Sequence, residues 1–389
     1  MKILLGHTFP EKSVFGKRWI EEWIERLRLG GFNIYPFSLV INNEKPVMYF
    51  DELDIRWKLK DPSLMNMYNE LIKELEQYDV FICYNGANIH PEFVKILPTL
   101  NVYGCFDDPE SSDKLSKPVA PFFDLAMVGN IAELENYKNW GCKHVYWWPL
   151  GFRIDDYDSA LSEDDIIMKN RKIDVTLLCE RETNYRKEKV DKFSSFFPQG
   201  VYHGKGWTKG FLPEEERVPT LQNTKIGINI HNSTGPINFR TFYLPANGVM
   251  QICDNKSNLG KIFELGKEVI GYDSIEEAIE LTKYFLQHED ERKKIALAGW
   301  KRALDDYNEI ASFQKVVEAI NNIKEILPLK KEDNKRLFMK NQNCKERFFL
   351  MIYNIYCEKV RVIKKILKNK YIELIVWLEI LGHMRFKRI

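Results

Sequence analysis

The chain lacks several features that would assign it quickly to a class of protein. Its seven cysteines are odd in number and scattered, and no pair has metal or redox spacing, so reduced thiols in a cytoplasmic protein are the simplest account. The sequence does not begin with a basic region and a long apolar run, so we expect no signal peptide and a cytoplasmic location. It also has no low-complexity tract and no short tandem repeat.

Apolar residues and aromatic rings, by contrast, are plentiful. The chain has 389 residues, of which 44% are hydrophobic, with 24 Phe, 18 Tyr and 9 Trp. This length and composition predict two well-packed domains with an appendage rather than a disordered protein. The net charge of +1 is unevenly distributed, because residues 330–389 carry 16 Lys and Arg against 6 Asp and Glu. The C-terminal segment is therefore a separate basic unit.

Short apolar runs alternate with helical patterns through the first 150 residues, which predicts a doubly wound parallel sheet. The strands expected there are Lys2–Gly6, Asn33–Leu39, Val80–Tyr84, Val102–Phe106, Leu125–Val128 and His144–Trp148, and the helices between them include Phe15–Leu29, Leu64–Gln77 and Ile131–Trp140.

A second α/β series follows the turn-like segment Gly151–Asp158. Its expected strands are Asp174–Cys179, Gly200–His203, Ile226–Ile230, Val249–Cys253 and Glu268–Tyr272, and its expected helices are Tyr185–Phe196, Phe239–Ala246, Leu259–Leu265, Ile275–Gln287, Asp290–Tyr307 and Ser312–Leu327. We therefore predict domains at residues 1–150 and 151–327, followed by a tail at 328–389. Ligands of open α/β sheets bind at the carboxyl ends of the strands, which places the expected site in the cleft between the domains. The alternative is two structural domains without a shared site.

The segment Asn238–Asn255, N-F-R-T-F-Y-L-P-A-N-G-V-M-Q-I-C-D-N, joins an Arg at a helix start to a helix and a buried strand. Asn238, Phe239 and Arg240 follow the flexible S-T-G-P segment, and free backbone N–H groups plus a guanidinium suit a diphosphate without a metal. The alternative is an Arg that caps or salt-bridges a surface helix. His231 lies at the end of the I-G-I-N-I-H strand, at the same edge. It either faces the ligand or has a structural role.

The loop His203–Trp207, H-G-K-G-W, has two glycines that allow close approach of the backbone to a ligand. Trp207 is a candidate for a base pocket, and Lys205 beside Gly206 is a candidate phosphate ligand; the alternative is a tight turn with a core Trp. Arg181 lies in the C-E-R-E-T-N-Y loop after the first strand of the second domain, at a ligand-facing edge.

On the N-terminal side, loops after two strands should open into the cleft. G-H-T-F, which contains His7, is no G-x-G-x-x-G fingerprint, but its histidine is a catalytic candidate. Asp107 and Asp108 follow another strand, where one of them would orient or deprotonate an acceptor hydroxyl, or would cap a helix. No D-x-D motif stands at a strand end; Asp156–Asp158 has the spelling but is expected on the surface, so we predict no metal site.

Residues 1 to about 327 resemble the GT-B glycosyltransferases, specifically the CgeB-like group with a "glycosyl transferases group 1" type domain. The motifs that carry the resemblance are K-I-G-I-N-I-H-N from Lys225, the segment Asn238–Asn255, L-G-K-I-F-E-L-G-K-E-V-I-G-Y-D-S from Leu259, E-D-E-R-K-K-I-A-L-A-G from Glu289 and V-Y-H-G-K-G-W from Val201. The resemblance implies a nucleotide-sugar donor in the C-terminal domain and an acceptor in the N-terminal one.

The family normally has, at the position of Tyr243, a Glu that bonds the donor ribose, so that this contact would depend on the Tyr hydroxyl. We expect metal-independent transfer of a sugar to a glycan or lipid-linked acceptor in cell-surface polysaccharide assembly, with Arg240 and Lys205 stabilising the departing diphosphate. The alternative is a non-catalytic nucleotide- or carbohydrate-binding protein on a degenerate scaffold, which the missing Glu favours.

Apolar and basic residues interleave from residue 344 to 389. The apolar run Tyr371–Leu381 is too short to cross a bilayer, so we expect amphipathic helices on an anionic membrane surface, with the enzyme at the inner face of the membrane. The alternative is helices that pack on the body or on another protomer. Nucleic acid is not an expected partner, because no recognition module accompanies the basic residues.

Overall fold

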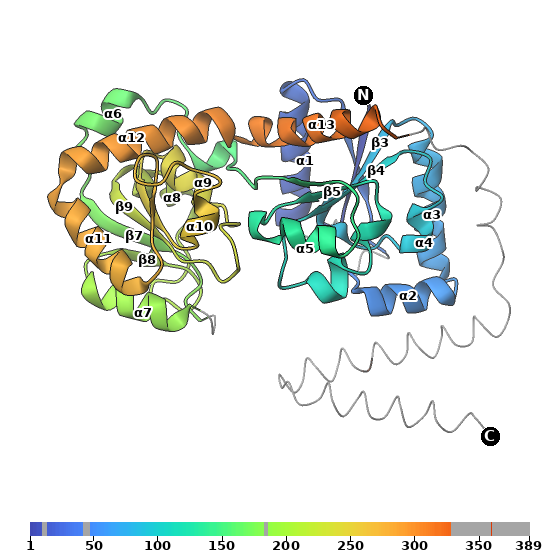
Figure 1. Ribbon diagram of the computed structural model, residues 1–389, viewed down its shortest axis with the longest axis horizontal. Helices are drawn as coiled ribbons and strands as arrows, with labels where there is room; N and C mark the ends of the chain where they lie inside the picture. The colour runs from blue at the N-terminus through green and yellow to red at the C-terminus, as the bar shows by residue number, and fades with distance from the viewer. Residues whose placement is uncertain (10–13, 42–46, 183–185, 328–358, 360–389) are drawn as a thin grey trace.

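The computed structural model describes residues 1–9, 14–41, 47–182, 186–327 and 359. Two all-parallel sheets flanked by helices form two domains that lie end to end (Figure 1). The first sheet has six strands in the order β2-β1-β3-β4-β5-β6, and the second has five in the order β11-β10-β9-β7-β8. The predicted class of two Rossmann-like α/β domains is therefore confirmed, whereas the predicted tail lies outside the described residues.

The first domain follows the predicted alternation closely. Its elements are β1 (Ile3–His7), α1 (Val14–Leu29), β2 (Ile34–Ser38), α2 (Phe50–Lys58), α3 (Pro62–Leu75), β3 (Val80–Cys83), α4 (Pro91–Val94), β4 (Leu100–Cys105), β5 (Leu125–Val128), α5 (Leu134–Asn139) and β6 (Val145–Trp147). The strands are continuous apolar runs because helices cover both faces of a parallel sheet.

The second domain begins after residue 151. Its elements are α6 (Glu163–Met168), β7 (Ile173–Leu178), α7 (Lys187–Phe196), β8 (Val201–His203), α8 (Glu214–Gln222), β9 (Thr224–Asn229), α9 (Arg240–Ala246), β10 (Met250–Cys253), α10 (Lys256–Leu259), β11 (Ile270–Gly271), α11 (Ile275–Gln287), α12 (Glu289–Asp306) and α13 (Glu309–Lys324). The helix predicted at Leu259–Leu265 is wrong, because α10 ends where that prediction begins.

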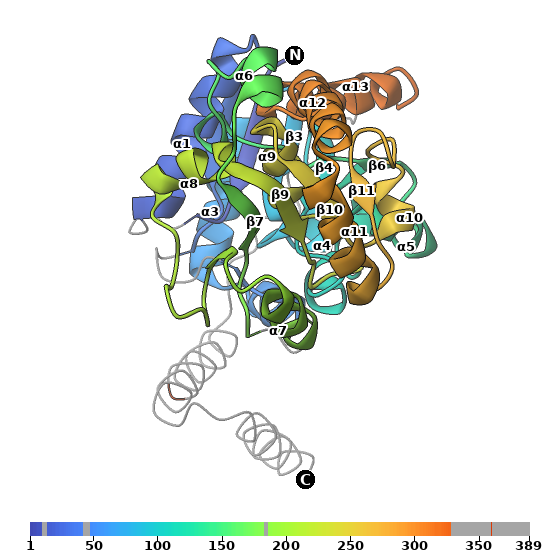
Figure 2. The same cartoon turned by 90° about the vertical axis from the view of Figure 1, so that its left-hand side faces the viewer.

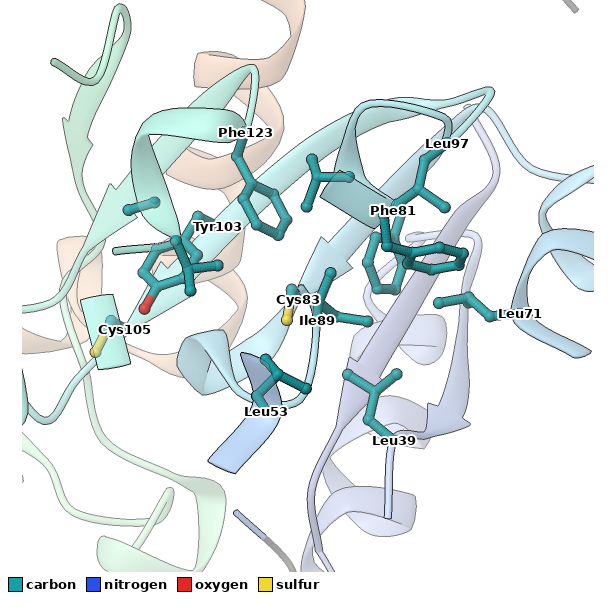
Figure 3. Packing of buried hydrophobic residues seen from close by; sticks show 14 of the residues in the cluster. Leu39, Leu53, Leu71, Phe81, Cys83, Ile89, Leu97, Tyr103, Cys105 and Phe123 are labelled. Atoms are coloured by element: carbon teal, nitrogen blue, oxygen red, sulfur yellow. The ribbon is translucent and has the colours of Figure 1, made fainter. Parts of the chain in front are cut away.

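Buried side chains fill both faces of each sheet. Figure 3 shows one cluster of the first domain, in which Phe81 of β3 and Tyr103 of β4 pack with Leu39, Leu71 and Phe123 from the surrounding segments. Figure 2, which turns the second domain toward the viewer, shows α11 and α12 beside strand β10; their side chains share a cluster with β7, β9 and β10. Each domain thus has its own core and a defined sheet edge on which to build a site.

The chain returns to the first domain at its end. Helix α13 covers one face of the first sheet, where Phe313 and Ile320 are buried in the same cluster as Ile3 and Trp23. Helix α13 thus belongs by sequence to the predicted second domain of residues 151–327 but packs on the first domain, and the division of the chain into domains stays a prediction. Among the described helices, none has the length and apolarity that crossing a bilayer requires.

Candidate functional site

The loops after β5 and β9 bring the two domains into contact. Asn130 Nδ2 lies 3.3 Å from Ser233 Oγ, and Thr234 Oγ1 donates a hydrogen bond of 2.7 Å to Glu133 Oε1. Gly235 is buried, and a Cβ atom there would lie 2.1 Å from Asn130 Oδ1. The carboxyl edges of the two sheets therefore face each other, as predicted. The S-T-G-P segment, which we expected to be flexible, is instead part of the domain contact.

Asn229, at the carboxyl end of β9, organises the edge of the second sheet. Its side chain is fully buried, and its Nδ2 donates to Thr241 Oγ1 at 3.1 Å and to Gln251 Oε1 at 3.1 Å. Its Oδ1 accepts from Asn238 Nδ2 at 3.0 Å and from Arg240 Nε at 3.1 Å. One buried amide thus ties β9, β10 and the start of α9 together.

Arg240 lies at this edge, where the sequence placed it. Its Nη1 donates to Leu178 O at 2.9 Å, and its Nη2 donates to Ile230 O at 3.4 Å, so the guanidinium bridges the carboxyl ends of β7 and β9. Its hydrogen-bond partners are an amide oxygen and backbone carbonyls, and no carboxylate of the described residues forms an ion pair with it. Its charge is therefore held in place without being neutralised.

Arg186 is a second cation at the same place. It is buried, its Nε donates to Glu180 O at 2.7 Å, and its Nη1 lies 3.4 Å from Ile230 O, the carbonyl that Arg240 also contacts. Burial lowers the pKa of Arg186, and the charge of Arg240 lowers it further. Two guanidinium groups therefore converge on one carbonyl, an arrangement that an anion would stabilise.

Helix α9 begins at Arg240, where the sequence predicted a helix start. Asn238 uses its side chain as a cap, because its Oδ1 accepts from Thr241 N at 3.1 Å. Phe239 O accepts from Phe242 N at 3.0 Å and from Tyr243 N at 2.9 Å. These bonds use the N–H groups of the first turn, whereas no hydrogen bond among the described residues uses the backbone N–H of Phe239 or Arg240. The binding of phosphate by free N–H groups here stays a prediction.

The side chain of Tyr243 is packed into a buried hydrophobic cluster. It is 7% exposed within the cluster that contains Phe152 and Tyr307, and burial raises its pKa to about 12. Burial of the ring makes Tyr243 a weaker candidate for contact with the donor ribose, and that contact stays a prediction. At this position the family normally has a Glu, and Tyr243 does not supply a carboxylate in its place.

His231 belongs to a buried hydrogen-bond network. Its Nδ1 lies 2.6 Å from Asp254 Oδ1, and its Nε2 lies 3.2 Å from Thr241 Oγ1. With Cys253, His231 and Asp254 place three ligand atoms within 4.8 Å of one another, which is close enough to share a metal ion. However, burial raises the pKa of the Cys253 thiol well above its usual value, whereas metal ligation needs the thiolate. The donor set fits a structural network better than a metal site, and metal independence remains a prediction.

The loop after β8 has a packing role. Trp207 donates from Nε1 to Cys179 O at 2.8 Å and stacks on Tyr202 with ring centroids 4.9 Å apart. Gly206 has a positive φ of 85°, a conformation that suits glycine. Lys205 is mostly exposed, with Nζ 3.2 Å from Glu180 Oε1. This geometry favours the tight-turn interpretation for Trp207 and leaves Lys205 as a candidate at the rim.

Arg181 is engaged by a neighbouring carboxylate. Its Nε donates to Asp191 Oδ1 at 2.6 Å, and the resulting ion pair raises its pKa. Because its side chain is 36% exposed and already neutralised, Arg181 is a weaker candidate phosphate ligand than Arg186 or Arg240.

The three N-terminal candidates have different environments. His7 is buried at the end of β1, and burial lowers its pKa to about 4, so that it is neutral at physiological pH. Asp107 is exposed and accepts from Asn85 Nδ2 at 2.6 Å. Asp108 is buried and accepts from Tyr137 Oη at 2.5 Å. Asp108 is therefore a weaker catalytic candidate than Asp107, because its buried carboxylate is engaged by Tyr137, and its catalytic role stays a prediction.

Asp156 corrects another expectation. It is 1% exposed, and its carboxylate accepts from Arg153 Nε at 3.0 Å and lies 3.0 Å from Arg217 Nη2. Asp158, the other acid of the D-Y-D motif, is exposed as predicted. Asp156 is thus a buried anchor of the segment that joins the domains, whereas we had expected both acids on the surface.

A small aromatic cavity of about 30 Å³ lies between the domains. Its aromatic lining is Trp19, Trp23, Tyr84, Phe106, Trp148, Phe152 and Phe239. Glu309, from the start of α13, also lines it, with one carboxylate oxygen 2.5 Å from Arg26 Nε and the other buried without a hydrogen-bond partner. A cavity of this volume has room for one or two water-sized groups and not for a sugar ring.

Sequence reasoning missed Arg186, Asn229 and Glu309. Asn229 carries a local signal, since it is the single polar residue in the buried run I-G-I-N-I. Arg186 and Glu309 carry none, because their contacts lie in distant parts of the chain: Ile230 for the first and Arg26 for the second.

Comparison with known proteins supports this fold. Residues 176–318 match a family model described as "Glycosyl transferase-like", which spans most of the second domain. No curated protein matched the chain by sequence.

Several solved structures share the architecture. HepE from Anabaena, in complex with UDP, is 12% identical with a TM-score of 0.55 and covers 83% of this chain and 100% of its own. Sucrose-phosphate synthase from Thermosynechococcus elongatus is 9% identical with a TM-score of 0.58, covering 84% and 100%. A glycosyltransferase from Rickettsia africae is 13% identical with a TM-score of 0.57, covering 83% and 99%. The resemblance to GT-B proteins is confirmed, and the CgeB-like subgroup remains a prediction.

Proposed function

We propose that this protein transfers a sugar from a nucleotide-sugar donor to a glycan or lipid-linked acceptor. The observation that carries the proposal is the convergence of Arg186 and Arg240 on Ile230 O at the cleft-facing edge of the second sheet. The match of this domain to a glycosyl transferase-like family model supports it, as does the UDP bound to HepE, a protein of the same fold.

The chemistry requires stabilisation of a departing diphosphate. Cleavage of the bond between the anomeric carbon and the phosphate oxygen leaves negative charge on the diphosphate. Arg240 and Arg186 are positioned by their carbonyl contacts before any ligand arrives, so they stabilise that charge with little reorganisation. Lys205 at the rim adds a further cation. This mechanism works without a metal ion, which is part of the proposal.

The acceptor would lie on the first domain. Asp107 is exposed at the carboxyl end of β4 and is the carboxylate best placed to accept a proton from an acceptor hydroxyl, with Asn85 orienting it. His7, which burial keeps neutral, would contribute a hydrogen bond rather than a charge.

We place this activity in cell-surface polysaccharide assembly in the cytoplasm. The motivating observation is the basic, apolar-interleaved segment from residue 344 to 389, which suits an anionic membrane surface on which lipid-linked acceptors lie. A non-catalytic nucleotide- or carbohydrate-binding protein is the second candidate. The Tyr at position 243 in place of the family's Glu, and the burial of its ring, favour this second candidate.

The test is a binding titration with UDP, GDP, dTDP and CMP, followed by the corresponding nucleotide sugars. The nucleotide that binds should lose roughly tenfold to hundredfold in affinity in Arg240→Met and in Arg186→Met, since a charged hydrogen bond is worth about 1.5–3 kcal/mol. Arg28→Met is the control, because Arg28 also bonds a backbone carbonyl but lies on α1. Unchanged affinity in folded Arg240→Met would overturn the assignment.

Turnover separates the two candidates. A transferase should release free nucleotide from its bound nucleotide sugar, slowly with water and faster with an acceptor glycan. Binding without any release, over a panel of sugars and acceptors, would support the non-catalytic alternative. Circular dichroism of each variant establishes that the second domain is folded.

A further inference from the structure

A second cluster of cations lies at the opposite edge of the second sheet. A hollow of about 10 Å³ is lined there by Ile166, Lys169, Arg171, Lys225, Gly248, Arg292, Lys293 and Ala296. Five of these eight residues are Lys or Arg, and none is Asp or Glu. Lysine and arginine are usually spread over a protein surface, so their convergence on one hollow needs a physical reason.

These cations are unusually buried. The side chain of Arg292 is 5% exposed, and those of Lys225 and Lys293 are 25% and 23% exposed. The carboxylates that pair with them, Asp174 and Glu289, are 57% and 55% exposed and so lie at the outer rim. The negative charges thus face solvent, while the positive charges face the hollow.

Arg171 illustrates the electrostatic imbalance. It is 6% exposed, and its guanidinium donates to three backbone carbonyls, those of Leu221 at 3.1 Å, Thr224 at 2.8 Å and Asn247 at 2.9 Å. Burial, together with the charge of Arg292, lowers its pKa to about 10. Two buried like charges that repel each other are destabilising, and an anion between them removes that repulsion.

We propose that this hollow is a binding site for an oxyanion of the phosphate class. Its volume accommodates about one water-sized group, so one or two phosphate oxygens enter while the rest stays at the surface. Arg171 and Arg292 contribute their remaining N–H donors from within, and the three lysines approach from the rim. The phosphate is either free or the terminal group of a monoester.

The hollow is separate from the proposed donor site. Lys225 lies at the start of β9, whereas Ile230 follows its end. Five residues of an extended strand place these positions roughly 17 Å apart. A phosphate in the hollow therefore does not occupy the place of a nucleotide diphosphate, and the two sites can be tested independently.

The experiment measures thermal unfolding of the full chain in rising inorganic phosphate, with sodium chloride holding ionic strength constant. Wild type should gain about 2–4 °C, and isothermal titration calorimetry should show saturable binding. The double variant Lys225→Ala/Lys293→Ala should lose most of the shift. Lys267→Ala/Lys283→Ala is the matched control, since both of its lysines pair with a Glu three residues away.

Two further arms distinguish the outcomes. Arg240→Met should keep the phosphate shift, and loss of the shift in that variant alone would overturn the proposal by placing phosphate at the donor edge. An equal shift in wild type and in Lys225→Ala/Lys293→Ala would also overturn it. Glycerol 3-phosphate in place of phosphate distinguishes the source: an equal shift indicates a monoester-binding site, and a shift with inorganic phosphate alone indicates a site for the free ion.

Discussion

Replacing Asp156 with Asn tests how much the negative charge of this buried acid contributes to stability. Asp156 links the segment that connects the domains to the second domain. Asp156 Oδ2 accepts hydrogen bonds from the backbone N of Arg153 at 3.1 Å and from its Nε at 3.0 Å. Asp156 Oδ1 accepts a hydrogen bond from Arg153 Nη2 at 3.1 Å. Arg217 Nη2 lies 3.0 Å from the same Oδ1. An Asn side chain offers only one acceptor oxygen, and its NH₂ group would face a guanidinium donor.

The expected loss follows from these contacts. Breaking a buried ion pair by removing one partner costs roughly 3–5 kcal/mol. Because the side chains of Arg153 and Arg217 are each 21% exposed, solvent offsets part of this, and we expect about 2–3 kcal/mol for Asp156→Asn. For a domain of this size, that corresponds to a fall in Tm of roughly 5–10 °C.

Asp158→Asn provides the control within the same motif. Asp158 is exposed, so its replacement should change the free energy of unfolding by no more than about 0.5 kcal/mol. Urea denaturation followed by circular dichroism measures both variants. Equal stabilities of Asp156→Asn and Asp158→Asn would refute the reasoning. Combining Asp156→Asn with Arg217→Met should cost less than the sum of the single changes, because both remove the same pair.

Two further predictions concern the cleft. Folding lowers the pKa of His7 from 6.5 to about 4, so the unfolded state binds a proton more readily than the folded state. The stability that this provides is fully present above pH 6.5 and is lost as the pH falls toward 4. At pH 5 the free energy of unfolding should be lower by about 2 kcal/mol. Urea titrations at pH 7.5 and 5 should show this loss in wild type and a smaller one in His7→Asn. Gly235→Ala should destabilise by roughly 1–3 kcal/mol, since its Cβ would overlap Asn130, whereas Gly260→Ala, 3.3 Å from a flexible Leu265, should be nearly neutral in the same assay.

The strands could be predicted because burial on both faces of a parallel sheet leaves continuous apolar runs. Helix α11 was predicted with its observed bounds, Ile275–Gln287, because apolar residues recur at helical spacing after the capping residue Ser274. The same spacing failed at Leu259–Leu265. There Ile262 and Phe263 are buried from an irregular turn rather than from a helix, and periodicity does not distinguish these cases.

The sequence predicted that the site lies at the carboxyl edge of the second sheet, but it did not predict the side-chain contacts there. Arg240 was predicted at the start of a helix, where α9 begins, and the topology of parallel sheets places such helix starts at the carboxyl edge. The role of Asp156 was missed because the spelling D-Y-D in a domain connection indicated a surface turn. Its bonds to nearby Arg153 do not by themselves indicate burial, and its other partner, Arg217, is distant in sequence. Tyr243 was assigned from the family pattern, which identifies a position but not the direction in which a substituted side chain packs.

Helix α9 connects the two proposed anion sites. An arginine is held in place at each of its ends, and this explains why both sites would bind an anion. At its start, Asn229 and two carbonyls hold the guanidinium of Arg240, and at its end Arg171 donates to Asn247 O. A cation that is already ordered loses little side-chain entropy when a ligand binds. Carbonyl partners satisfy N–H groups but carry no net charge, so the positive charge at each end stays uncompensated. An anion that contacts Arg240 or Arg171 therefore gains electrostatic energy without displacing a carboxylate from that guanidinium, although the lysines at the rim of each site are already paired with acids. This is why we expect binding rather than a purely structural role for the two arginines.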